Sequence, residues 1–127
     1  MSARVGRKVQ TLRKKKVSKK SIVKKLDALW RAKILERDKV CQYPGCLKRN
    51  LQAAHVFSRR IRSVRWNLDN GVGFCAYHHL RWAHVHWEAF RDLVLQKIGQ
   101  DRFDALKEKA YQFKGKVDLE QIERDLE

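Results

Sequence analysis

The sequence contains no long apolar run, although hydrophobic residues make up 43% of its 127 residues. A membrane-spanning helix needs about 20 consecutive apolar residues, so the sequence predicts none and no membrane partner. The amino terminus is basic and no apolar segment follows it, which argues against a secretory signal peptide. We therefore expect a cytoplasmic protein. A chain of this length and composition predicts one modest domain with a small core.

Cysteine is scarce, and all three cysteines lie between Cys41 and Cys75. An odd number does not suit a disulfide framework, and paired cysteines in a reducing compartment more often bind metal. A Pro-Gly turn separates Cys41 from Cys46, and His78 follows Cys75 with the two-residue gap common in zinc loops. These four residues predict a closed structural zinc site. The alternative, unrelated buried thiols, leaves both ligand spacings unexplained.

Acidic residues are also few, and the formal net charge is +16 with a pI near 10.2. Such a surface attracts polyanions, so nucleic acid is the expected partner. Residues 1–20 carry no acid and predict a flexible basic arm that binds phosphates, the alternative being a solubilising tail. Residues 21–115 would form the zinc-stapled domain. Residues 116–127 form an acidic amphipathic tail with a structural or partner role.

Apolar periodicity predicts an α+β fold class. In chain order, the expected elements are a helix over residues 21–39, a strand over 51–58, a loop over 67–71, helices over 76–99 and 101–111, and a short helix or frayed tail over 117–127. Ser21 is the expected N-cap of the first helix, and Trp30 is expected in the core. Gly99 is expected to end the long helix.

Two histidines are candidates for chemistry on a phosphodiester. His55 follows the expected strand, and a histidine near its ordinary pKa suits a general base. An amide oxygen from the Asn67–Asn70 loop could fix its tautomer; a half-buried structural histidine is the alternative reading. His78 and His79 are adjacent and must point in different directions. One can close the zinc site while His79 holds a hydrated divalent ion together with the phosphate.

Further polar residues fit supporting roles. Four arginines crowd the turn after His55 and are expected to bind the DNA backbone: Arg59, Arg60, Arg62 and Arg65. His84 and His86 are expected to contact phosphate or to lie on the surface. In a continuous helix His86 would share a face with His79 at a distance of about 10 Å, too far to ligate the same ion. Glu88 is either a supplementary ligand or a helix-surface charge.

With these residues placed, residues 40–99 resemble the HNH endonucleases, and within them most closely the phage NinG/Rap recombination nucleases. The HNH pattern has a Cys pair, a His after the first strand, an Asn five residues before a second Cys-x-x-Cys/His pair, and a final His or Asn. The matching residues are Cys41 and Cys46, His55, Asn70, Cys75 and His78, and His79. The runs HVFSR and RWNLDN, and a helix ending in KIG, are similar to NinG sequences.

The resemblance implies a small ββα-metal (His-Me finger) core and a metal-dependent endonuclease acting on duplex or branched DNA. It implies that His55 is the general base, that Asn70 is the loop residue supporting it, and that His79 is a catalytic metal ligand. The cofactors would be a structural Zn²⁺ and Mg²⁺ or another divalent ion, with no small-molecule cofactor. A phage origin would place the protein in the cytoplasm of a bacterial host, and paired cuts would suit a homodimer.

One position departs from the HNH pattern. Most HNH enzymes carry Asp or His immediately before the base, as a second metal ligand, and Ala54 stands there. NinG-like sequences also have a small residue at this point. The second ligand is therefore open among four candidates: Asn67, Asp69, Glu88 and His84. The competing hypothesis is a non-enzymatic zinc-containing nucleic-acid-binding protein.

Overall fold

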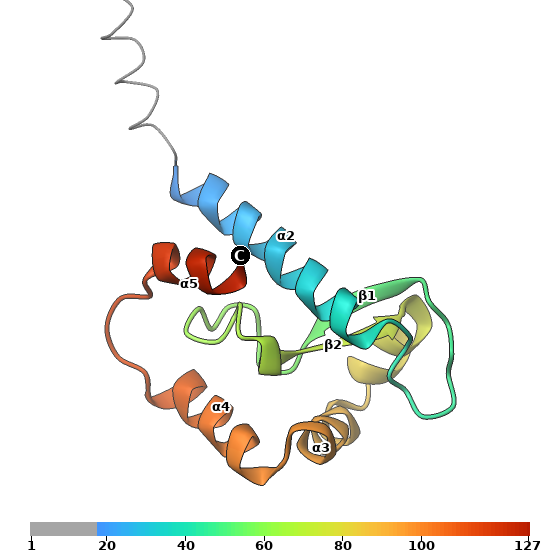
Figure 1. Cartoon of the computed structure of the whole chain (residues 1–127). Helices are drawn as coiled ribbons and strands as arrows, with labels where there is room; N and C mark the ends of the chain where they lie inside the picture. Colours follow the sequence, from blue (N-terminus) through green and yellow to red (C-terminus); the bar gives the residue numbers. More distant parts are fainter. Residues whose placement is uncertain (1–17) are drawn as a thin grey trace, which may run out of the picture.

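An antiparallel pair of strands lies among helices in this α+β chain (Figure 1). The computed structural model describes residues 18–127, so all but the last residues of the expected basic arm lie outside it. In chain order the elements are α2 (Lys19–Asp38), β1 (Leu51–His55), η1 (Leu68–Asn70), β2 (Gly71–Cys75), η2 (His78–Ala83), α3 (Trp87–Ile98), α4 (Gln100–Gln112) and α5 (Leu119–Leu126). The strand register pairs Leu51 with Cys75 and His55 with Gly71.

Helix α2 begins earlier than expected. The hydroxyl of Ser18 accepts a hydrogen bond from the backbone N–H of Ser21 at 3.1 Å and so caps the helix. Ser21 is therefore inside the helix, and the prediction that it is the N-cap is wrong. Residues 19–20, assigned to the arm from sequence, are helical. The helix buries Leu26, Trp30 and Ile34, which confirms the expectation that Trp30 belongs to the core.

The two strands separate two groups of buried side chains. Ala54 belongs to one group with residues of η2, α3 and α4, whereas its neighbour Ala53 packs against the group formed around α2. This division follows from the strand period of two. The expected strand over residues 51–58 is confirmed only as far as His55. Strand β2 was not predicted, because every residue of GVGFC is buried and the segment shows no alternation.

The long helix expected over residues 76–99 is interrupted. Residues 76–77 are helical and lead into the π-helix η2, residues 84–86 leave the helix, and α3 begins at Trp87. His86 precedes α3 with non-helical backbone angles (φ −111°, ψ 57°). Gly99 ends α3 as expected, in the left-handed region at φ 87°, and also precedes α4 directly, so Asp101 is not the cap.

The acidic carboxy-terminal segment forms a helix that docks on α2 (Figure 1). Leu126 is 3% exposed in the cluster of Leu26 and Trp30, and the neighbouring apolar residues pack around it: Val117, Leu119 and Ile122. Lys25 forms an ion pair with Glu123. Of the two forms left open from sequence, a short helix or a frayed tail, the structure shows the helix. Within residues 18–127, no helix combines the length and apolar character needed to cross a bilayer.

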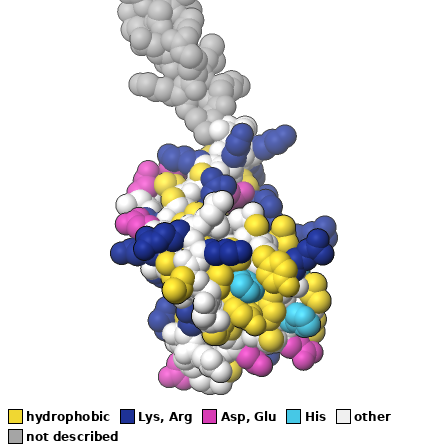
Figure 2. Space-filling model, turned by 90° about the vertical axis from the view of Figure 1, so that its right-hand side faces the viewer, with side chains coloured by type: hydrophobic (Ala, Val, Ile, Leu, Met, Phe, Trp, Pro, Cys, Tyr) yellow, Lys and Arg dark blue, Asp and Glu magenta, His cyan; other side chains and the backbone are white. Residues whose placement is uncertain are grey.

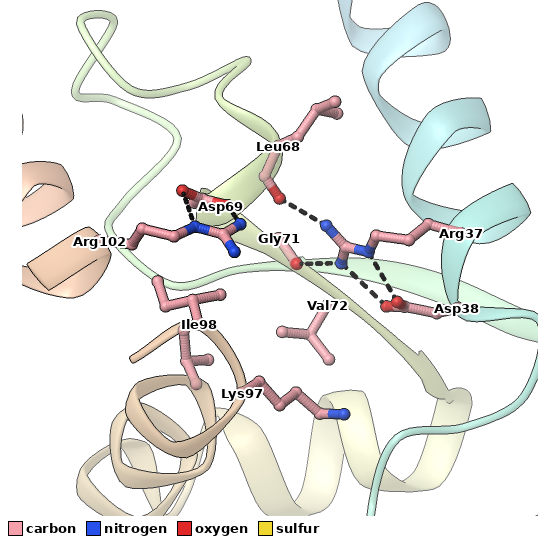
Figure 3. A pocket seen from close by; sticks show the side chains of 10 residues that line it. Arg37, Asp38, Leu68, Asp69, Gly71, Val72, Lys97, Ile98 and Arg102 are labelled. Atoms are coloured by element: carbon pink, nitrogen blue, oxygen red, sulfur yellow. Dashed lines mark hydrogen bonds and ion pairs between the residues drawn. The ribbon is translucent and has the colours of Figure 1, made fainter. Parts of the chain in front are cut away.

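A cavity of about 270 Å³ lies where α2, η1, β2, α3 and α4 meet (Figure 3). Here Arg37 donates hydrogen bonds to the carbonyl oxygens of Leu68 at 2.7 Å and Gly71 at 2.8 Å. Asp38 accepts a hydrogen bond from the backbone N–H of Gly73 at 2.7 Å. Because these polar groups are paired within the protein, the cavity serves as a structural junction that fixes α2 against β2.

Substitution of Gly71 can test how closely α2 packs on β1 and β2. A Cβ atom at Gly71 would lie 2.3 Å from Cζ2 of Trp30, whereas one at Gly73 would lie no closer than 3.2 Å to a side-chain carbon of Leu51. Overpacking of a buried contact costs about 1–3 kcal/mol. We expect Gly71→Ala to lower the free energy of unfolding by this amount and Gly73→Ala to lower it less, measured by urea denaturation. Equal losses would contradict the packing described.

Candidate metal centre and histidine cleft

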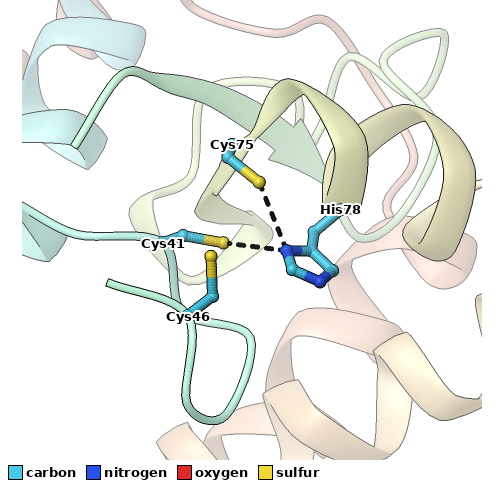
Figure 4. A group of neighbouring side chains, drawn as sticks. All are labelled: Cys41, Cys46, Cys75 and His78. Carbon is cyan, nitrogen blue, oxygen red and sulfur yellow. Dashed lines mark hydrogen bonds between the residues drawn. The ribbon is translucent and has the colours of Figure 1, made fainter. Parts of the chain in front are cut away.

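The four predicted zinc ligands converge (Figure 4). One ligand atom from each of Cys41, Cys46, Cys75 and His78 lies within 4.8 Å of all the others. Nδ1 of His78 is 3.4 Å from Sγ of Cys41 and 3.2 Å from Sγ of Cys75. Three thiol sulfurs and one imidazole nitrogen form the donor set of a closed tetrahedral zinc site. This group could hold a structural metal such as zinc.

Local backbone structure brings the ligands together. Between Cys41 and Cys46 the chain turns at Gly45, whose φ of 84° suits glycine, and the N–H of Cys46 donates to the carbonyl of Tyr43 at 2.9 Å. Cys75 is the last residue of β2, and His78 is the first residue of η2. The Tyr43 ring stacks on the imidazole of His78, with centroids 4.0 Å apart and planes 6° from parallel. This stack holds the imidazole in its ligating orientation.

The thiols differ in acidity. Burial raises the pKa of Cys41 to about 11, so this thiol is protonated at neutral pH when no cation is near. Burial also acts to raise the pKa of Cys75, but hydrogen bonds from the His78 backbone and the other two cysteines outweigh it and leave the pKa below its ordinary value. Because zinc binds thiolates, metal binding here should release protons.

A second site opens beside the metal centre. A cavity of about 480 Å³ is lined by His55, His79 and His84, together with Trp30 and Arg59. The two histidines predicted for catalysis therefore face the same cavity. Figure 2 shows the face of the molecule where histidine side chains reach the surface among apolar side chains, with Lys and Arg nearby. A phosphate approaching this face would meet imidazole nitrogens and positive charge.

The tautomer of His55 is fixed by a backbone group. Nε2 of His55 lies 2.9 Å from the carbonyl oxygen of Arg65. A carbonyl only accepts, so Nε2 carries the proton and Nδ1 keeps its lone pair. The ring stacks on Trp30, with centroids 4.0 Å apart and planes 12° from parallel. The expectation that an amide of the Asn67–Asn70 loop would orient His55 directly is therefore wrong.

Asn70 instead holds the segment that follows His55. Its side chain is fully buried, and its Nδ2 donates to the carbonyl oxygens of Phe57 at 3.1 Å and Val64 at 3.0 Å. Its Oδ1 accepts a hydrogen bond from the Phe57 N–H at 2.7 Å. These bonds use both ends of the amide and fix the loop that carries Arg65. Any support that Asn70 gives to His55 passes through this loop.

Arg65 is held by α2 and is not a free surface cation. Its guanidinium donates to the Asp27 carboxylate at 3.0 and 2.7 Å, and its side chain is 11% exposed. Trp66 Nε1 donates to the same carboxylate at 2.8 Å. The prediction that Arg65 contacts DNA is thus corrected, whereas the other arginines of the turn are exposed: Arg59, Arg60 and Arg62. Sequence reasoning missed Asp27, because a pairing across 38 positions leaves no local pattern.

His79 also has a fixed orientation. Its Nδ1 lies 2.7 Å from Oε1 of Gln52, an oxygen that only accepts, so Nδ1 carries the proton and Nε2 keeps its lone pair. The ring of His84 lies edge-on to it, with centroids 4.9 Å apart. Burial lowers the pKa of His79, and the charges of His84 and His55 lower it further. Gln52 carried no signal in the sequence, since an exposed glutamine on a strand is ordinary.

The remaining candidates for a second metal ligand lie elsewhere. Glu88 lines a separate cavity at the start of α3, together with His86. Asp69 forms an ion pair with Arg102, and the side-chain oxygen of Asn67 accepts from the Asp69 N–H at 2.9 Å. Of the four candidates, His84 is the one that lines the cavity of His55 and His79, which we call the histidine cleft. The expected common face of His79 and His86 is absent, because the helix is broken between them.

No family model matches this chain, and no curated protein or solved structure matches it either. Its function must therefore be argued from the chemistry of the cleft.

The pKa of His55 offers a test of the cleft's electrostatics. Burial lowers this pKa, and the positive charges of Arg59 and Arg65 lower it further. A lowered pKa keeps the imidazole neutral at pH 7. We expect Arg59→Gln to raise the pKa of His55 toward its ordinary value, measured by NMR titration of the imidazole. Arg62→Gln serves as the charge-matched control and should leave it unchanged; equal shifts in both variants would contradict a specific contribution from Arg59.

Metal removal tests the cysteine cluster. Structural zinc contributes about 10–16 kcal/mol of binding free energy in small zinc domains, much of it expressed as folding. We expect about one zinc ion per chain by elemental analysis, and we expect a chelator to lower the melting temperature sharply. Cys46→Ser should reproduce this loss. A metal-free chain that keeps its melting temperature would contradict the assignment.

Proposed function

We propose that this protein is a metal-dependent HNH-type endonuclease that hydrolyses phosphodiester bonds of duplex or branched DNA. The observation that carries the proposal is that His55 and His79 line one cavity, each with one ring nitrogen hydrogen-bonded to an oxygen (Nε2 of His55, Nδ1 of His79) and the other nitrogen left with its lone pair. Hydrolysis of a phosphodiester needs a base for water and positive charge at the phosphate. The cleft offers groups suited to both needs.

His55 would act as the general base. Its Nδ1 would take a proton from a water molecule as the water oxygen attacks phosphorus and the bond from phosphorus to the leaving oxygen breaks. The Arg65 carbonyl bonded to Nε2 would stabilise the imidazolium that forms, and the Trp30 stack would keep the ring in place. The lowered pKa of His55 favours the neutral, proton-accepting form at neutral pH.

His79 would hold the catalytic divalent ion through Nε2. Such an ion supplies charge stabilisation at the phosphate and at the leaving oxygen. The Gln52 side chain fixes the tautomer that leaves Nε2 available, which is the usual role of an outer partner of a ligating histidine. The zinc cluster lies at the start of η2 and would hold the segment that carries His79 against the strands.

The proposed fold is a ββα-metal core. Strands β1 and β2 and the helical turn η2 contact one another, and His55 and His79 lie on β1 and η2. This arrangement supports the HNH reading, with Asn70 as a positioning residue in the loop between the strands. A phage recombination role is part of the same proposal and rests on the resemblance, and a homodimer would suit paired cuts on duplex DNA.

Binding to DNA would depend mainly on charge. Of the exposed arginines of the turn, Arg59 lines the cleft, and the net charge of +16 attracts phosphates along a duplex. Contacts of this kind position a backbone without reading its sequence. The affinity should therefore fall steeply with salt and depend weakly on sequence.

A second candidate is a zinc-containing nucleic-acid-binding protein without catalytic activity. The observation that favours it is Ala54, whose methyl group is buried and offers no ligand. The net charge and the metal cluster of the protein would suit this role equally well. The paired histidines in one cleft argue for the nuclease, because a binding module has no use for a base beside an available metal-binding nitrogen.

Cleavage of supercoiled plasmid tests the proposal. We expect the wild-type chain to nick the plasmid with Mg²⁺ or Mn²⁺, and we expect His55→Ala to lose about 10²–10⁴-fold in rate, the usual contribution of a general base. The matched control is His86→Ala, which removes an exposed histidine outside the cleft. A gel-shift assay should show that His55→Ala still binds DNA.

Equal nicking by wild type and His55→Ala would remove the catalytic role of His55. An absence of nicking by the wild type, with several metals and with linear, supercoiled and branched substrates, would remove the enzyme reading. DNA binding without cleavage would then favour the second candidate.

A further inference from the structure

The π-helical turn η2 places His84 beside His79. An α-helix has 3.6 residues per turn, so residues five apart point about 140° away from each other. In a π-helix the hydrogen bonds run from residue i to i+5, and residues five apart come to lie close together. The ring centroids of His79 and His84 are accordingly 4.9 Å apart. The wide turn therefore pairs two imidazoles that a regular helix would separate.

The separation of the two rings matches the separation in a shared ligand pair. Each metal–nitrogen bond of imidazole is about 2.1 Å, so two rings on one ion at roughly right angles have centroids about 4.5–5 Å apart. The observed 4.9 Å lies in this range. Nδ1 of His79 is bonded to Gln52, which leaves Nε2 for an ion. His84 is exposed and lines the same cavity as His55.

We propose that His79 and His84 form a two-histidine site for a divalent transition-metal ion in the histidine cleft. A catalytic role for this ion rests on the proposed function. The metal site itself is inferred from the positions of the two rings. His84 would then be the second protein ligand, a role that the side chain of Ala54 cannot fill. A phosphate oxygen and water would complete the coordination shell.

The donor chemistry sets the preference for the ion. Two neutral imidazoles suit nickel, cobalt, zinc and copper, whereas Mg²⁺ prefers oxygen ligands. The one carboxylate that lines the cavity belongs to Asp27, and its oxygens already accept bonds from Arg65 and Trp66. An ion held by His79 and His84 in the absence of DNA is therefore of the imidazole-binding class. Mg²⁺ should bind the free site far more weakly, and it would need the phosphate oxygens of bound DNA to complete its shell.

Calorimetric titration of Ni²⁺ into the full chain, loaded beforehand with one zinc ion per chain, tests the site. We expect one Ni²⁺ to bind the wild type. His84→Ala should weaken this binding by at least the roughly 10–100-fold that loss of an outer partner of a metal ligand costs. Gln52→Ala should weaken it within that range. His86→Ala is the matched control and should bind as the wild type does, and Mg²⁺ at the same concentration should give no comparable signal.

Retained zinc and an unchanged melting temperature establish that each variant is folded. Unchanged Ni²⁺ affinity in His84→Ala, or equal weakening in His86→Ala, would overturn the two-histidine site, and plasmid cleavage by the wild type would still support the nuclease. Conversely, Ni²⁺ binding that depends on His84 in a chain that cleaves no DNA would establish the site and remove the nuclease.

Discussion

The convergence of three sulfurs and one ring nitrogen within 4.8 Å is the constraint on which the functional face depends. It joins the loop after α2 to the end of β2 and the start of η2, and it adds to the hydrogen bond between Gln42 and Gly73 and the stacking of Tyr43 on His78. A domain with a core this small commonly needs such reinforcement. The next residue along the chain after the last ligand is His79, so the position of the cleft follows from the position of the cluster.

The opposite wall of the cleft is built by α2. Trp30 stacks on His55, and Asp27 holds the arginine whose carbonyl orients the same ring. Both side chains, Trp30 and Asp27, lie on α2 and thus outside the segment that carries the metal cluster and the histidines. One wall of the cleft is therefore held in place by the metal cluster. The other is held by an ion pair and by aromatic packing. Neither wall alone would define the direction of the imidazole nitrogens.

Sequence patterns identified what depends on local spacing. The four residues of the cluster follow from ligand spacing and the helix before it from apolar periodicity, and the structure places both close to their expected positions. The π turn was not predictable, because a segment of 6 residues is too short for its periodicity to separate one kind of helix from the other. The partner of His55 was also hidden, since a backbone carbonyl has no sequence signature. Strand β2 was missed because burial on both faces removes the alternation that marks a strand.

The docking of α5 on α2 has a consequence for the order in which the molecule is completed during synthesis. Leu26 and Leu126 share one buried cluster although 100 positions separate them in the chain. A ribosome releases residues in sequence, so α2 emerges before α5 and cannot contact this partner until residue 126 has left the ribosome. The metal cluster can close earlier, since its ligands span residues 41–78. The nascent protein should thus close its metal cluster first. The α2 wall behind His55 should gain its contacts with α5 last.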